Sequence, residues 1–278
     1  MLAEVGDAEL LAGGTDLVPT LRAGDRQPRT LVALRGVLEL RARAVAPDAL
    51  TIGAGVTYTE LASWEQARGL AATARAVGSA QIRNSGTVGG ALGTANPRGD
   101  LLTFLLAAGA DVLTRSVRKG ARTVPLADYL GRTPTGAGRA ELVTAVRVPA
   151  PRGPQVFLKI GGRQAAYPAL VNLALVVDRA AGRVSCAVGG VAAGRLRATA
   201  AEQLAAGEID WTRPRPGDAG VAHRFGALVA LAASRAPGQL PAGPRDPVDY
   251  RWHAAGVLAE RALARALAAP VTSRQGPL

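Results

Sequence analysis

Apolar residues in the first half of the chain fall into short runs, some with the twofold period of a strand and others with the longer period of a helix. A mostly apolar run over residues 8–12 stops at Gly13-Gly14, so this unit reads as strand, turn and short helix. Thr57-x-x-Glu60 has the capping-box pattern that begins a helix. The predicted strands are residues 30–34, 50–56, 110–114 and 142–148, and the predicted helices are residues 17–23, 57–68, 71–81 and 100–108.

A proline-rich stretch, Pro149 to Pro154, is the clearest linker and predicts a domain boundary near residues 150–155. Beyond it the pattern predicts strands over 156–160, 170–178 and 184–191 and helices over 200–206, 221–235 and 250–268. Residues 173–177 are also compatible with a helix. The pattern therefore predicts a mixed fold, either α+β or α/β.

The composition indicates a folded protein without membrane insertion. The chain has 278 residues, of which 48% are hydrophobic, enough for one large domain or about two or three smaller ones. The longest apolar runs, residues 101–108 and 169–177, are too short to span a bilayer. The first residues lack the basic and apolar stretches of a signal peptide, so we expect a cytoplasmic protein.

The numbers of cysteine, histidine and aromatic residues argue against metal binding and nucleic-acid binding. Cys186 is the single cysteine, so the chain can form no internal disulfide and no cysteine-ligated cluster of its own, and we expect a small buried residue in a strand. His223 and His253 are far apart and are interpreted as structural or surface residues. The net charge of +12 comes almost entirely from scattered arginines, and aromatic residues are only 4%, so we expect no nucleic-acid partner.

The first glycine-rich turn is the segment from Ala12 to Leu17, which reads Ala-Gly-Gly-Thr-Asp-Leu. Because Gly13 and Gly14 have no Cβ, successive backbone N–H groups can turn toward one point and a ligand can approach closely. Such a concavity at the start of a helix suits a phosphate or a diphosphate, and Thr15 adds a hydroxyl. Asp16 is expected to cap the helix, since its charge would repel a phosphate.

A second glycine-rich segment covers residues 82–94 and continues into a turn that ends at Asp100. Gly89 and Gly90 could expose N–H groups to another part of the same ligand. Thr87 and Thr94 offer hydroxyls, and Asp100 could accept a hydrogen bond from a ribose. Neither segment is a G-x-G-x-x-G or P-loop motif, and each is also compatible with an ordinary tight turn in a chain rich in alanine and glycine.

Together these segments resemble the FAD-binding subunit of the xanthine dehydrogenase and carbon monoxide dehydrogenase family. That family carries A-G-G-T-D-L and later I-R-N-x-G-T-[VI]-G-G-N-L, followed by a Pro-Gly-Asp type of turn, and residues 12–17, 82–92 and 96–100 match in order and distance. Residues 187–192, 197–198 and 250–251 are similar to its C-terminal domain. The resemblance therefore extends over nearly the whole chain.

The resemblance implies an α+β fold: a two-subdomain, PCMH-type FAD-binding domain over residues 1–150, with subdomains of about 1–50 and 51–150, and a C-terminal α+β domain over 155–278. FAD would lie between the two subdomains. Lys159 matches a lysine close to the isoalloxazine, although it could also be a solvated charge at a strand end. The implied cofactor-binding residues are Ala12, Gly13, Gly14, Thr15, Asp16, Leu17, Thr87, Val88, Gly89, Gly90, Thr94, Asp100, Val143 and Lys159.

The family works as a heterotrimer, and the resemblance implies the same partners here. A molybdopterin-binding large subunit would oxidise the substrate, a 2Fe–2S small subunit would relay electrons, and this chain would receive them on FAD and pass them to NAD, a quinone or oxygen. The complex is expected to be a dimer of heterotrimers. No side chain is a candidate catalytic acid, base or nucleophile, and no metal site is expected.

Two features depart from the family and keep alternatives open. Ala91 stands where the family usually has asparagine, and the strand and helix that normally precede the first turn are absent, or the start codon is misassigned. An absent segment would leave a sheet edge exposed. The alternatives are a flavin-free assembly subunit and a self-contained FAD oxidoreductase, for which Tyr167 or Lys159 would have to act near the flavin.

Overall fold

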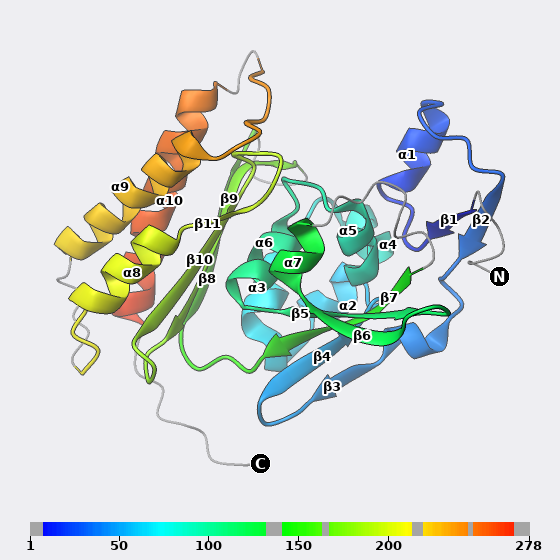
Figure 1. The fold of residues 1–278 in the computed structure, drawn as a ribbon, viewed down its shortest axis with the longest axis horizontal. Coiled ribbons are helices and arrows are strands. Elements are labelled where there is room, and N and C mark those ends of the chain that lie inside the picture. Colours follow the sequence, from blue (N-terminus) through cyan, green and yellow to red (C-terminus); the bar gives the residue numbers. More distant parts are fainter. Residues whose placement is uncertain (1–7, 132–140, 163–166, 213–218, 244–246, 270–278) are drawn as a thin grey trace. The chain divides into compact units, whose positions relative to one another are not determined.

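The computed structural model describes residues 8–131, 141–162, 167–212, 219–243 and 247–269. The chain divides into two compact units (Figure 1). The first contains Met1–Ala150 and Gly161–Ala169, and the second contains Pro151–Ile160 and Leu170–Leu278. The first unit carries all the predicted site residues except Lys159.

The first unit begins with a small parallel sheet. Strand β1 (Ala8–Leu11) pairs with β2 (Thr30–Ala33), and helix α1 (Leu17–Arg22) lies between them in sequence. Of the residues in these three elements, only Ala8 is buried. Few apolar contacts therefore stabilise this part of the unit.

A five-stranded antiparallel sheet, in the order β3-β4-β7-β5-β6, forms the centre of the first unit. Ile52, Val112 and Val146 occupy neighbouring positions on adjacent strands, and all are fully buried. Helix α6 is buried along its whole length, as expected for a helix whose residues are nearly all apolar. The strands are β3 (Arg43–Val45), β4 (Ala49–Gly53), β5 (Asp111–Ser116), β6 (Gly120–Pro125) and β7 (Glu141–Pro149). The helices are η1 (Leu38–Arg41), α2 (Tyr58–Ala62), η2 (Glu65–Ala67), α3 (Arg68–Ala76), α4 (Ala80–Ser85), α5 (Val88–Thr94), α6 (Asp100–Ala107) and α7 (Leu126–Gly131).

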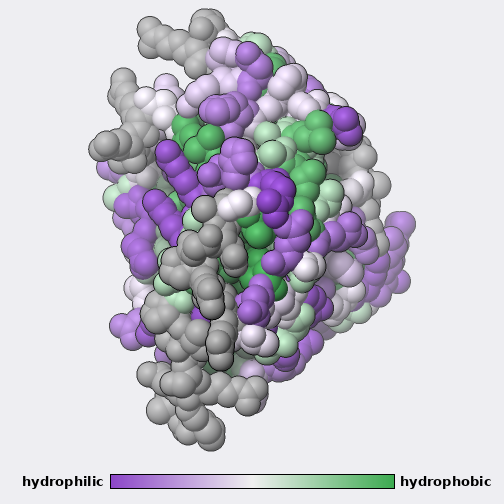
Figure 2. All heavy atoms as spheres, turned by 90° about the vertical axis from the view of Figure 1, so that its left-hand side faces the viewer, coloured by the Kyte–Doolittle hydropathy of each residue, from purple (hydrophilic) through white to green (hydrophobic). Residues whose placement is uncertain are grey.

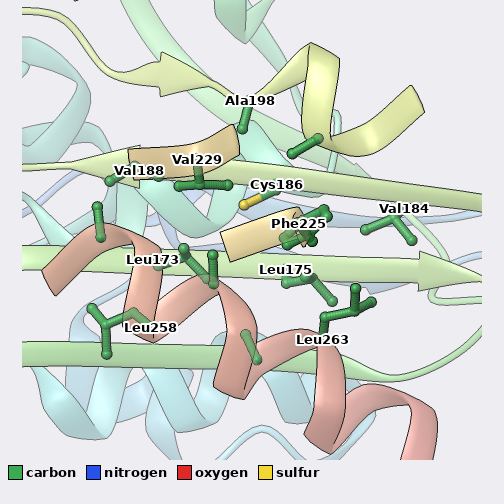
Figure 3. Close-up of a cluster of buried hydrophobic side chains, with 14 of the residues drawn as sticks. Leu173, Leu175, Val184, Cys186, Val188, Ala198, Phe225, Val229, Leu258 and Leu263 are labelled. Atoms are coloured by element: carbon green, nitrogen blue, oxygen red, sulfur yellow. The ribbon is translucent and has the colours of Figure 1, made fainter. Parts of the chain in front are cut away.

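The second unit is a four-stranded sheet, in the order β11-β10-β9-β8, covered by helices on one face (Figure 1). Leu173 and Leu175 from β9 point into the same cluster as Phe225 from α9 and Leu258 from α10 (Figure 3). Figure 2 views the side on which these helices lie, where hydrophobic areas are interspersed with hydrophilic residues. The elements are β8 (Gln155–Gly161), β9 (Ala169–Asp178), β10 (Arg183–Gly189), β11 (Leu196–Arg197), α8 (Thr199–Glu208), α9 (Ala219–Arg235) and α10 (Val248–Ala268).

The strand interpretation of residues 173–177 is confirmed, and the helical alternative is wrong, because these residues pair with β10 along β9. Cys186 is fully buried in β10, as expected (Figure 3). Burial raises the pKa of its thiol, and the nearby carboxylate of Glu202 raises it further. The thiol is therefore an inert apolar group.

Two predicted helices are divided differently in the structure. The capping box of Thr57 and Glu60 is confirmed, but helix α2 ends at Ala62, and Trp64 has an extended backbone before η2. The second predicted helix, residues 71–81, becomes α3 and α4. Gly78 separates them because its φ of +43° cannot belong to a right-handed helix. Strands β3 and β6 and helix α7 were not predicted, since each is short and lacks a clear apolar period.

Candidate functional site

The first glycine turn presents a row of unpaired amides. Gly14 has a φ of +71°, which turns the chain sharply between β1 and α1. Within the part of the chain that the structure describes, none of the backbone N–H groups of residues 13–16 donates a hydrogen bond. Consecutive unpaired amides next to a glycine turn form a concavity that favours an anion. This geometry is the one expected of a phosphate-binding turn.

The side chains of this turn contribute less than the backbone. Asp16 occupies the N-cap position of α1, but its carboxylate accepts no capping hydrogen bond from the helix, contrary to the expectation. It accepts instead from the Thr15 hydroxyl, at 3.1 Å between the two oxygens. Ala12 and Leu17, on either side, are half-buried. The groups that this turn leaves available are therefore mainly backbone N–H groups.

The second glycine segment is held by hydrogen bonds within the protein. The Gly89 N–H donates to the Ala54 carbonyl at 2.7 Å, and the Gly90 N–H donates to the Thr87 hydroxyl, the N-cap of α5, at 3.0 Å. Both amides are thus engaged, contrary to the expectation that they would be exposed to a ligand. Gly89 serves close packing instead, because a Cβ there would lie 2.7 Å from the Ala54 Cβ.

The two segments meet at the end of helix α4. A Cβ added at Gly13 would lie 2.0 Å from the Ser85 carbonyl oxygen and 2.9 Å from the Gly86 Cα. Real Cβ atoms do not approach backbone atoms so closely, so only glycine fits at position 13. The first turn therefore rests directly on the backbone that leads into Thr87 and α5.

A short network behind Thr87 supports this arrangement. Thr57 and Thr87 form an isolated antiparallel bridge, and the Thr57 N–H and hydroxyl both donate to the Glu60 carboxylate at 2.8 Å. Burial alone would raise the pKa of Glu60. Hydrogen bonds from Thr57 and from Arg41 outweigh that effect, so the pKa lies below its ordinary value. A charged Glu60 thus stabilises the start of α2 beside the second segment.

The remaining predicted residues lie on the surrounding elements. Thr94 ends α5, where its exposed hydroxyl donates to the Gly90 carbonyl at 3.0 Å. Asp100 is buried as the first residue of α6, and Gly99 rather than Asp100 takes the cap position. Val143 lies on β7, next to Thr144, whose carbonyl accepts from the Ala54 N–H at 2.9 Å. Val143 is therefore one residue from a hydrogen-bonded chain that reaches Gly89.

Lys159 lies on β8 in the second unit, where it is half-buried. Its place beside the flavin therefore stays a prediction. Three residues outside the predicted cofactor-binding set complete the described site: Ala54, Ser85 and Gly86. In the sequence, the signals for these residues were the glycines on either side of Ala54 and the glycine after Ser85. Only the structure shows that Ala54 contacts Gly89 and that Ser85 and Gly86 contact Gly13.

Among the described residues, no three histidine, cysteine, aspartate or glutamate side chains are placed to hold a metal ion. None of the helices in this part of the chain is both long and apolar enough to cross a membrane.

Comparison with known proteins identifies the family of the first unit. Residues 1–151 match the family described as the FAD binding domain in molybdopterin dehydrogenase. The chain is 30% identical over 172 residues to the glyceraldehyde dehydrogenase medium chain of Sulfolobus acidocaldarius, which covers 60% of this chain and 61% of that one. It is 30% identical over 205 residues to the nicotine 6-hydroxylase medium subunit of Paenarthrobacter nicotinovorans, which covers 71% of each chain.

The structure of the chain is also similar to solved structures. A solved structure of carbon monoxide dehydrogenase from Hydrogenophaga pseudoflava superposes with a TM-score of 0.84 at 26% identity, covering 96% of this chain and 92% of that one. The fold is of mixed α+β class, and the matching family model describes an FAD-binding domain. The chain belongs to the family of FAD-binding domains of molybdopterin dehydrogenases.

Proposed function

We propose that this chain is the FAD-binding electron-transfer subunit of a heterotrimeric molybdenum hydroxylase. In this role it receives electrons from a 2Fe–2S subunit and passes them to an external acceptor. The observation that carries the proposal is the row of unpaired amides at residues 13–16, seated on the Ser85–Gly86 backbone. A site of this kind within a domain of the FAD-binding family supports a diphosphate cradle.

The backbone of the first turn suits the diphosphate of the cofactor. The four backbone N–H groups of residues 13–16 can donate hydrogen bonds to its oxygens, and glycines without a Cβ let it approach closely. Bound FAD would supply the redox chemistry, which no side chain of this site offers. Thr94 and Asp100 would supply polar contacts, Val143 an apolar one, and Lys159 a positive charge near the ring.

The partners follow from the relatives' names and from the cysteine count. The two relatives described above are a medium chain and a medium subunit, which supports large and small partners for this chain. Cys186 is the only cysteine of the sequence and is fully buried, so a 2Fe–2S cluster would belong to another subunit. The proposal includes a molybdopterin-binding large subunit, a cytoplasmic location and a dimer of heterotrimers.

Co-purification with cofactor analysis tests the proposal. The chain is expressed together with a molybdopterin-binding subunit and a cysteine-rich small subunit encoded beside it, and the complex is analysed for FAD, iron and molybdenum. One FAD per copy of this chain is expected, as is a flavin that becomes reduced only when both partners and the substrate are present. The acceptor is found by rapidly mixing the reduced complex with NAD, a quinone or oxygen.

Two results would replace the proposal. A complex that contains both partners and no flavin would make this chain an assembly subunit. An isolated chain that reduces its own flavin with a small substrate would make it a self-contained oxidoreductase. A reduced complex that reacts with none of the three acceptors would refute the electron-transfer role.

A further inference from the structure

Helix α4, residues 80–85, carries the backbone against which the first turn rests, yet none of its residues is buried. Burial of apolar side chains, which fixes most helices on their neighbours, therefore contributes little to its position. Any rotation of α4 would move the Ser85 carbonyl oxygen. Because Gly13 packs directly on that oxygen, the turn would move with it. Polar contacts must hold α4 in place.

One side chain of α4 closes the turn through which the helix joins the rest of the domain. The Arg83 Nη1 donates to the Val77 carbonyl at 3.0 Å and to the Gly78 carbonyl at 2.9 Å. Both carbonyls belong to the sharp connection between α3 and α4, where Gly78 has a φ of +43°. Hydrogen bonds from a charged donor are roughly twice as strong as neutral ones. Arg83 thus fastens the helix to the connection that precedes it.

The other end of α4 is tied to helix α2. The Tyr58 N–H donates to the Gly86 carbonyl at 3.1 Å, and the Thr59 hydroxyl donates to the Asn84 side-chain oxygen at 2.6 Å. A Cβ at Gly86 would lie 2.7 Å from the Tyr58 ring, so the chain passes closely over that ring. Helix α4 is therefore held at its start by Arg83 and at its end by α2.

We infer that Arg83 is a positioning residue for the diphosphate of FAD. It makes no contact with the first turn itself. By fixing α4 it holds the Ser85–Gly86 backbone against Gly13, and so keeps the amides of residues 13–16 in place. The inference rests on the proposed function, because it takes those amides to be the diphosphate cradle. Asn84 also helps to hold α4, through its hydrogen bond with Thr59 of α2, and we expect its contribution to FAD affinity to be smaller than that of Arg83.

Arg83→Met tests the inference in the full-length chain, with Arg75→Met as the matched control. Arg75 also donates from one Nη1 to one carbonyl, that of Ala62 at 2.6 Å, but it lies on α3 and does not hold α4. FAD dissociation constants come from flavin fluorescence, and the phosphorus NMR shifts of bound FAD report the surroundings of the diphosphate. We expect Arg83→Met to weaken FAD binding about tenfold or more, which corresponds to about 1.4 kcal/mol, and to move those shifts. Arg75→Met should change neither.

Arg83→Lys should restore much of the affinity, because a single nitrogen makes both of the bonds to residues 77 and 78. If Arg83 contributed only to stability, both methionine variants would melt at a lower temperature and the phosphorus shifts of bound FAD would be the same in the two. That result would also overturn the inference. If Arg83→Met does not fold, Asn84→Ala decides, with FAD binding expected to weaken several-fold. The inference is overturned if Arg83→Met binds FAD with wild-type affinity and wild-type phosphorus shifts. The same result in Asn84→Ala overturns it if Arg83→Met does not fold. A wild-type chain that binds no FAD overturns the proposed function instead.

Discussion

Gly13→Ala is the substitution for which the structure gives the sharpest expectation. The added Cβ would lie 2.0 Å from the Ser85 carbonyl oxygen, whereas real Cβ atoms almost never come closer than 3.0 Å to such an atom. The turn and helix α4 must therefore separate by at least about 1 Å. The three nearest atoms at position 13 are all backbone atoms, so no flexible side chain can move aside.

The cost of such overpacking is typically about 1–3 kcal/mol. In the free protein the turn can tilt away, because only Ala8 is buried in its three flanking elements. With FAD bound, the same tilt would draw its amides away from the diphosphate that they are proposed to bind. Most of the cost should therefore appear in the affinity, which would fall between about fivefold and about 150-fold. The melting temperature of the flavin-free protein should change little.

Titration of the flavin-free chain with FAD, followed by flavin fluorescence, measures the loss. Gly36→Ala is the matched control, because it lies after β2 in the same subdomain and an added Cβ has no neighbour within 4 Å. It should bind FAD as the wild type does. A folded Gly13→Ala variant with wild-type affinity would refute the reasoning, since the clash would then have no bearing on the cofactor.

Four further predictions test other parts of the chain. Gly90→Val should abolish FAD binding by occupying the ligand's approach, since within the protein a Cβ there meets only the Thr87 hydroxyl at 3.1 Å; retained flavin would count against the site. Thr57→Ala removes the capping box and should cost about 1 kcal/mol in a denaturant titration, with an unchanged midpoint as the contrary result. Because Glu60 has a lowered pKa, its stabilisation is complete above its ordinary value of 4.5 and is lost as the pH falls; Glu60→Gln should flatten that part of the melting profile. Cys186 should stay unmodified by a thiol reagent until the protein unfolds, and rapid labelling of the folded chain would contradict its burial.

Much of the fold could be predicted from the sequence because its signals are local. The capping box needs only Thr57 and Glu60, three residues apart, and both hydrogen bonds are formed. Strands β4, β5, β7, β9 and β10 follow from runs of apolar and β-branched residues. The glycine turn at residues 13–14 was evident because a non-glycine residue rarely adopts a positive φ.

The helices around the site were harder to predict for an equally physical reason. Residues 57–81 have helical composition throughout, but Trp64 and Gly78 interrupt the chain where packing requires a change of direction. Propensity within a short window cannot register such a requirement. The short strands β3 and β6 are mostly exposed and therefore lack an apolar period, although each pairs with its immediate neighbour in the sequence, β4 and β5.

By itself the sequence located two glycine-rich segments, predicted them to be a dinucleotide site, and indicated that the one thiol is a buried strand residue. Tertiary structure alone decided what each glycine is for. It gave the amides of residues 13–16 no partner, gave those of Gly89 and Gly90 partners within the protein, and set Gly13 against Ser85. The reason is that a backbone angle depends on neighbouring residues, whereas the partner of an amide and the room for a Cβ depend on segments that only folding brings together.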